Sequence, residues 1–478
     1  MNYKTIFYTL GMVIGCEGFC MFLPLICALC YGEKEWYHFL FTFILCFVFA
    51  LILTYKKPEK KNIYAKEGFV IVSLSWIFMS IFGAIPFMLS GVIKGFIPAL
   101  FEIVSGFTTT GASILTDLTF VPKSILFWRS FAHWLGGMGV LVLLVAILPL
   151  SGGSNLHLLR AESTGPSVSK LVPKVKSSSK ILYAIYIGLT FLQVILLLFS
   201  GLNLFEALTL SFGTAGTGGF AIVDSSIGEY SDLVQWIISI FMILFAIDFS
   251  VYYLIIIRKV KLAIKSEEVR AFLGIIFASV LIITLNCYHI FGNIYDTIKH
   301  ALFQVGSIIT TTGYSTYDFN LWPELSKTIL GVLMIIGACA GSTGGGVKVS
   351  RILILLKSVV KEIKVAAHPK STHKSLLNGR TIEHETVRAV NVYMVSYIAI
   401  FVISLLLISF NNKDFTTNIT GVITALNNVG PAFGEIGTAG YFGKFTDFSL
   451  LIFIFDMLAG RLEIFPLLIL FSKYTWKK

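Results

Sequence analysis

The 478-residue chain is too apolar for a soluble domain, because 56% of its residues are hydrophobic and only 13% are charged, whereas soluble domains carry about a quarter charged residues. Its formal net charge of +11 indicates a membrane topology and not a nucleic-acid partner, since most lysines and arginines lie beside apolar runs, where the positive-inside rule places cytoplasmic loops. These basic segments are 56–66, 160–180, 258–270, 348–388 and 473–478.

Two apolar helices are predicted first, near residues 5–31 and 37–55. The first lacks a small-x-small cleavage site, so it is interpreted as an uncleaved span and not as a signal peptide. The basic run at 56–66 then places the N-terminus in the cytoplasm. Because no glycine loop accompanies this pair, residues 1–66 are expected to be an accessory to the rest of the chain.

The remaining sequence predicts four units of one plan, in which a spanning helix, a short helix, a glycine loop and a second spanning helix follow one another. The units are expected at 67–165, 166–265, 266–375 and 376–478. Their helices are predicted at 68–92, 98–109 and 124–149, at 180–201, 204–215 and 232–257, at 269–292, 296–309 and from 326, and at 385–410, 416–426 and 446–473. The short helices cannot span a membrane and are interpreted as re-entrant. The expected fold class is an all-α polytopic membrane protein with four helix–pore-loop–helix units around one central pore.

The four glycine loops, at 108–112, 216–220, 310–314 and 427–431, carry the predicted ion chemistry. One such loop would fit an ordinary helix contact, but four at like positions predict a filter of backbone carbonyls that replaces the hydration shell of a cation. None contains Asp or Glu, which favours a weakly hydrated monovalent ion over calcium. The candidate potassium-binding residues are Thr109, Thr110, Gly111, Thr217, Gly218, Gly219, Thr311, Thr312, Gly313, Asn428, Val429 and Gly430.

The glycine-rich segment, residues 337–348, interrupts the second helix of the third unit. It differs from a phosphate-binding loop because Val347 stands at the lysine position and no strand precedes it. Consecutive glycines break helices, so the segment is predicted to be a movable gate, with a passive kink as the alternative. The candidate gate residues are Gly341, Ser342, Thr343, Gly344, Gly345, Gly346 and Arg461.

Charged residues inside predicted membrane helices indicate function by default, because they are expensive there. Arg461 is followed by too many apolar residues to reach the inner surface, so it is expected to face the ion path, with Asp456 or Glu463 as neutralising partners. Asp248 is predicted within the helix 232–257, where pairing with Arg461, cation binding and protonation all remain open. Arg129 and His133 are expected to anchor a helix at the outer interface, beside two tryptophans.

Seven stretches resemble the TrkH family of potassium-uptake proteins, in the Trk/Ktr/HKT superfamily. They are SGFTTTGAS (105–113), RSFAHWLGGMG (129–139), AGTGGF (215–220), ITTTGY (309–314), GACAGSTGGGVKVSR (337–351), NNVGPAFG (427–434) and AGRLEIFP (459–466). The most specific are the glycine-rich segment and the stretch around Arg461. The chain departs from the family at Gly216, where serine is usual, and at Asp248, where asparagine is expected.

The resemblance implies gated potassium uptake across the bacterial inner membrane by a multi-pass homodimer with one pore per subunit. It also implies a TrkA-like cytosolic subunit that binds the regulatory nucleotide, contact with membrane lipid, no organic cofactor on this chain and no nucleic-acid partner. Glycine and not serine at Gly111 favours potassium over sodium. Proton- or sodium-coupled symport and a less selective Ktr/HKT-type transporter remain alternatives. An enzyme is not expected, because no convergent His, Ser or carboxylate groups share one depth.

Overall fold

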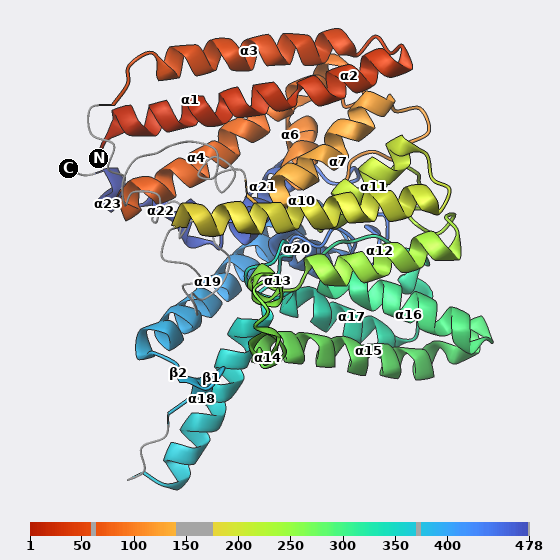
Figure 1. The fold of residues 1–478 in the computed structure, drawn as a ribbon, viewed down its shortest axis with the longest axis vertical. Coiled ribbons are helices and arrows are strands. Elements are labelled where there is room, and N and C mark those ends of the chain that lie inside the picture. Colours follow the sequence, from red (N-terminus) through yellow and green to blue (C-terminus); the bar gives the residue numbers. More distant parts are fainter. Residues whose placement is uncertain (59–63, 140–174, 370–373, 477–478) are drawn as a thin grey trace.

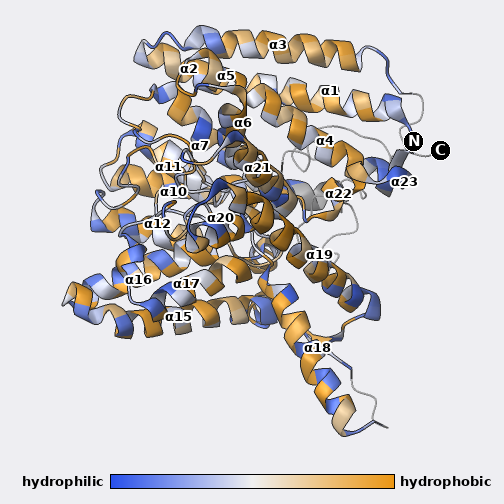
Figure 2. Cartoon of the chain, turned by 180° about the vertical axis from the view of Figure 1, so that it is seen from behind, coloured by the Kyte–Doolittle hydropathy of each residue, from blue (hydrophilic) through white to orange (hydrophobic). Residues whose placement is uncertain are grey.

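The computed structural model describes residues 1–58, 64–139, 175–369 and 374–476, and it is built almost entirely of helices (Figure 1). Within these residues, six helices are long and apolar enough to cross a membrane, or seven if one bent pair counts as a span. The apolar character follows the helices, as Figure 2 shows along α1 and α3. The predicted all-α polytopic class is confirmed.

The accessory pair lies at one side of the molecule (Figure 1). Its elements are α1 (Tyr3–Cys20), α2 (Phe22–Tyr31) and α3 (Trp36–Thr54). α1 packs closely on α3 because Gly11, Gly15 and Gly18 face Ala50 and Cys46 across the contact. Small residues let helix backbones approach in a membrane, where apolar burial contributes little to helix association. α1 also packs on the first helix of the next unit.

The first two units contain the expected sequence of helices. The first comprises α4 (Ala65–Gly83), α5 (Ile85–Leu89), α6 (Phe96–Phe107) and α7 (Lys123–Gly137). The second comprises α10 (Val175–Phe199), α11 (Leu204–Ala215), α12 (Asp232–Phe245), α13 (Phe249–Ile256) and α14 (Val260–Ile264). The predicted continuation of α7 to residue 149 lies mostly outside the described residues, as does most of the basic segment 160–180.

The last two units repeat the plan and add a helix that projects from the bundle (Figure 1). The third comprises α15 (Glu267–Phe291), α16 (Ile294–Ile309), η1 (Phe319–Leu321), α17 (Glu324–Ile336) and the projecting α18 (Val349–Ala367). A hairpin of β1 (Leu376–Leu377) with β2 (Arg380–Thr381), antiparallel with Leu376 opposite Thr381, stands at the start of the fourth unit. The fourth comprises α19 (His384–Ile408), η2 (Ser409–Asn411), α20 (Phe415–Asn427), α21 (Asp447–Arg461), α22 (Phe465–Phe471) and α23 (Lys473–Trp476).

The units pack in a closed circle. The short helix of each later unit packs against the second helix of the unit before it, so α11 contacts α7, α16 contacts α12 and α20 contacts α17. The same relation joins the last unit to the first, because α6 contacts α21. One chain therefore builds a ring with four similar interfaces, and the four short helices lie between the second helices.

The second helices of the second and fourth units are shorter than predicted. The prediction of continuous helices at 232–257 and 446–473 is wrong, because both are broken. α12 and α13 meet at a bend of 90°, and α21 ends at Arg461 before α22 begins. The described second helices contain 15, 14, 13 and 15 residues. The break predicted for the third unit alone therefore recurs in the second and fourth units.

Candidate functional site

Each of the four glycine loops packs against its neighbouring loops. A Cβ atom added to Gly111 would lie closer than 3.0 Å to the carbonyl oxygen of Gly218, and one added to Gly219 would be equally close to that of Thr312. The remaining contacts complete the circle, because Gly313 faces the carbonyl of Val429, and Gly430 faces that of Thr110. Each unit therefore contributes the carbonyl preceding its glycine to one ring of four.

The loops share one backbone conformation. The glycines have φ values of 81°, 74°, 86° and 96°, which residues with a side chain rarely adopt. Substitution at these positions would add both backbone strain and a clash with the neighbouring carbonyl.

The residue two positions before each glycine is also left-handed, with φ between 54° and 58° at Thr109, Thr217, Thr311 and Asn428. Each short helix ends in the same Schellman-type closure, in which the amide before the glycine donates to a carbonyl five residues earlier, at 2.8–3.0 Å. Asparagine tolerates this conformation, but β-branched threonine does so only under strain. Strained residues cluster at functional sites, where the surrounding structure holds them in place.

A buried ion pair supports the first loop. Arg129 Nε lies 2.7 Å from Glu102 Oε1, and Arg129 also donates to the Ser113 hydroxyl at 3.1 Å. Glu102 accepts the amide of Ile114 at 2.8 Å, just beyond the loop. Arg129 is 2% exposed, so its prediction as an outer-interface anchor is wrong. The arginine lies inside because α6 and the loop that follows it cover this face of α7.

His133 links the first two units. Its Nε2 accepts the amide of Phe220 at 3.2 Å, and its Nδ1 lies 2.7 Å from the carbonyl of Gly106. This pattern requires the neutral tautomer with its proton on Nδ1. His133 is fully buried, so it too is not an outer-interface anchor. It packs behind the second loop, where a side chain on Gly218 would strike the imidazole.

Side chains also connect the other loops. The Tyr314 hydroxyl donates to the carbonyl of Leu210 at 3.2 Å, which joins the third unit to the second. Asn428 Nδ2 donates to the Thr110 hydroxyl at 3.0 Å and to the carbonyl of Met457 at 2.9 Å, which joins the fourth unit to the first. The fourth loop, which departs most in sequence, thus takes part in the ring through its asparagine.

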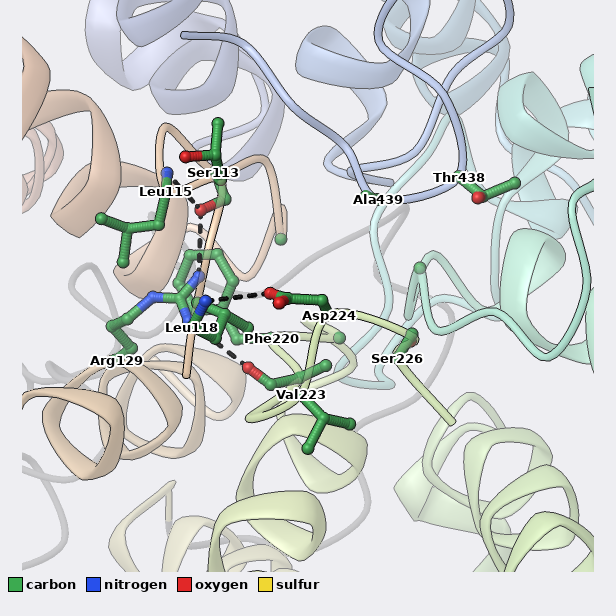
Figure 3. A pocket seen from close by; sticks show the side chains of 15 residues that line it. Ser113, Leu115, Leu118, Arg129, Phe220, Val223, Asp224, Ser226, Thr438 and Ala439 are labelled. Carbon is green, nitrogen blue, oxygen red and sulfur yellow. Dashed lines mark hydrogen bonds between the residues drawn. The ribbon is translucent and has the colours of Figure 1, made fainter. Parts of the chain in front are cut away.

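A small cavity of about 80 Å³ opens against the ring (Figure 3). Gly111, Gly219 and Gly313 line it together with residues 438–439 of the fourth unit. Asp224 lies at its edge and accepts the amide of Leu118 at 2.9 Å. Within the described residues, no group of three or more His, Cys, Asp or Glu side chains is arranged to hold a metal ion. The ring of loop carbonyls beside this cavity is the candidate ion-binding element.

The glycine-rich segment lies directly against the glycine loops. Gly345 donates its amide to the Thr311 hydroxyl at 2.6 Å, and Gly346 donates to the carbonyl of Asn427 at 3.0 Å. Its other side fits into the bend between α12 and α13, where the amide of Cys339 donates to the carbonyl of Ala246 at 3.2 Å. The segment thus passes beneath two loops and fills the break in the second unit.

Arg461 joins three units at this level. Its guanidinium donates to the carbonyl of Thr343 at 2.8 Å, in the glycine-rich segment. It also donates to the carbonyls of Gly136 and Gly137 at 2.6 and 2.7 Å, at the end of α7. The arginine therefore fixes the segment to both the first and the fourth unit.

The three acids proposed around Arg461 have other contacts. Glu463 pairs with Arg351, and Asp456 accepts the Ser404 hydroxyl at 2.6 Å. Asp248 was predicted to lie within a helix, and this is wrong. It caps α13 by accepting the amide of Ser250 at 2.8 Å.

The sequence interpretation missed Glu102, whose position in a short apolar helix is the feature that would have identified it.

Four loops of one chain that enclose a ring of carbonyls, inside a polytopic helical bundle, define a membrane protein of the ion-transporting class. The family model "TrkH: Cation transport protein" matches residues 36–477. The chain belongs to this TrkH family.

Its relatives extend over the whole chain. "Trk system potassium uptake protein TrkH" of Escherichia coli K12 is 36% identical over 487 residues, which cover 100% of both proteins. "Trk system potassium uptake protein TrkI" of Halomonas elongata is 30% identical over 431 residues, 89% of this chain and 87% of that protein. The crystal structure of "the Potassium Transporter TrkH from Vibrio parahaemolyticus" matches with a TM-score of 0.90 at 31% identity and covers 100% of both chains. The predicted resemblance is confirmed.

Proposed function

We propose that this protein takes up potassium across the bacterial inner membrane through a gated pore whose filter is the ring of glycine loops. The observation that carries the proposal is the circle of contacts by which Gly111, Gly219, Gly313 and Gly430 each meet a neighbouring carbonyl. Carbonyl oxygens in such a ring replace the hydration shell of a monovalent cation. The full-length relatives are named as potassium uptake proteins, which supports potassium as the ion.

The proposed gate is the glycine-rich segment, in particular residues 341–346. Arg461 is proposed to hold this gate closed. The contact of the segment with two loops, and the bonds by which Arg461 joins it to the first and fourth units, support these roles. Coupled symport is less favoured. Asp248, the candidate proton carrier, caps α13 and faces Gly341 instead of the glycine loops.

Assembly and topology complete the proposal. The name "Trk system" carried by the relatives supports a TrkA-like cytosolic subunit that binds the regulatory nucleotide. We further propose a homodimer, a cytoplasmic N-terminus, and unit boundaries as predicted from the sequence. The boundary at 165–166 lies outside the described residues.

The test is growth at low potassium in a bacterium that lacks its own uptake systems, with a TrkA-like subunit supplied. We expect the intact protein to restore growth and Gly313→Ser to abolish it or make it sensitive to sodium, because a side chain at Gly313 collides with the carbonyl of Val429. Gly274→Ser is the matched control, since nothing lies within 4 Å of a Cβ there. Equal growth with Gly313→Ser at equal membrane expression would refute the filter assignment.

A further inference from the structure

Two adjacent acids begin α15, and they bind different parts of the chain. Glu268 Oε1 accepts the amide of Ala340 at 2.6 Å and the amide of Ser350 at 3.1 Å. Glu267 instead pairs with Lys357 of α18 and accepts the amide of Asn378, beside the hairpin, at 2.8 Å. One acid therefore holds the glycine-rich segment, and the other holds the projecting helix and hairpin.

The two amides bound by Glu268 enclose the proposed gate. Residues 341–346 lie between Ala340 and Ser350, so one carboxylate oxygen fixes both ends of that stretch to the rigid first helix of the unit. A carboxylate that accepts backbone amides makes charge-assisted bonds, which are stronger than neutral ones. Loss of this acceptor leaves two amides without a partner at both ends of the segment at once.

We propose that Glu268 is a positioning residue that holds the glycine-rich segment across the ion path; the inference rests on the proposed gate function of that segment. The segment contacts the glycine loops through Gly345 and Gly346, and Glu268 lies on the opposite side. Release of Glu268 frees both ends of the segment, so the segment is then held by its remaining contacts, among them those with the loops and with Arg461, and leaves its position more readily.

The native Cys339 provides a direct measure of this position. It lies in the segment, is fully buried and is a free thiol. The experiment replaces the other six cysteines with alanine and measures the rate at which a charged maleimide labels Cys339 from the cytoplasmic face of inverted membrane vesicles. Because the amide oxygen of glutamine also accepts hydrogen bonds, Glu268→Gln is the conservative variant. Glu267→Ala controls for the loss of an acid at the same helix end.

We expect Glu268→Ala to label roughly tenfold faster or more, the factor that loss of a charge-assisted hydrogen bond predicts. Glu267→Ala is expected to label at the parent rate, and Glu268→Gln, which keeps neutral hydrogen bonds only, is expected to label more slowly than Glu268→Ala. Unchanged labelling of Glu268→Ala would overturn the inference, as would equally fast labelling of either control. Rubidium flux measured in parallel separates the two proposals. Faster labelling without faster flux would retain the positioning role of Glu268 and refute the blocking role of the segment.

Discussion

At the scale of single residues, the buried pair of Glu102 and Arg129 contributes most clearly to stability. The two side chains are 0% and 3% exposed, and removal of one partner from such a pair costs about 3–5 kcal/mol because the other charge stays buried. We expect Glu102→Ala and Arg129→Ala each to lower the unfolding temperature in detergent strongly. The double variant Glu102→Ala, Arg129→Ala should lose less than the two single changes together. Strictly additive losses would show that the pair does not act as a unit.

The sequence located the glycines of the ring but not the residues that support them. A motif identifies Gly111 because residues with a side chain rarely adopt its φ of 81°. The positions of Arg129 and His133 depend on what covers α7, and the covering groups come from α6 and from the second unit. Such contacts are set by packing between segments that are far apart in the sequence. The adjacent tryptophans, which favour an interface, therefore led to the wrong location.

At the scale of elements, the break between α12 and α13 was not predictable from local sequence. Apolar residues continue through it, and helix propensity alone favours one helix. The break leaves the carbonyls of Phe245 and Ala246 without a partner in their own helix. They accept the amides of Thr343 and Cys339, which lie about a hundred residues away in the next unit. By contrast, the break at the glycine-rich segment was predicted, because consecutive glycines disfavour a helix locally. Asp248 was the one local indication of the second break, since aspartate is a preferred helix cap.

The contacts of Arg461, at the end of α21, lead to a separate prediction. Arg461→Ala removes three charge-assisted bonds to carbonyls, each of which contributes about 1.5–3 kcal/mol. We expect rubidium flux through the purified protein in liposomes, without its cytosolic partner, to rise roughly tenfold or more. Arg461→Lys should lie between, because a single ammonium cannot reproduce the planar fork. Arg270→Ala, which removes an exposed arginine on α15, is the matched control and should not change flux. A similar rise in the control would refute the proposal that Arg461 holds the gate closed.

At the scale of the whole molecule, the four units form a ring whose members are similar but not identical. Three loops place a strained threonine two residues before the glycine, whereas the fourth places Asn428 there. Its side chain donates to Thr110 and to Met457, and within the described residues Thr109, Thr217 and Thr311, at the equivalent positions, make no such bond to a neighbouring loop. The repeat in the sequence predicted the circle of units, because four like segments close most simply around one axis. It did not predict how the fourth unit meets the first.

Because four distant parts of the chain meet at the ring, an ion bound there should stabilise the entire fold. A ligand at a hundred times its dissociation constant contributes about 2.7 kcal/mol. We expect a higher unfolding temperature in potassium chloride than in choline chloride at equal ionic strength, with a smaller increase in sodium chloride. Gly313→Ser should lose the potassium effect, because its side chain displaces the carbonyl of Val429, whereas Gly274→Ser should keep it. Identical unfolding temperatures of the intact protein in potassium and choline would contradict ion binding at the ring. A potassium effect retained in Gly313→Ser would place the ion elsewhere.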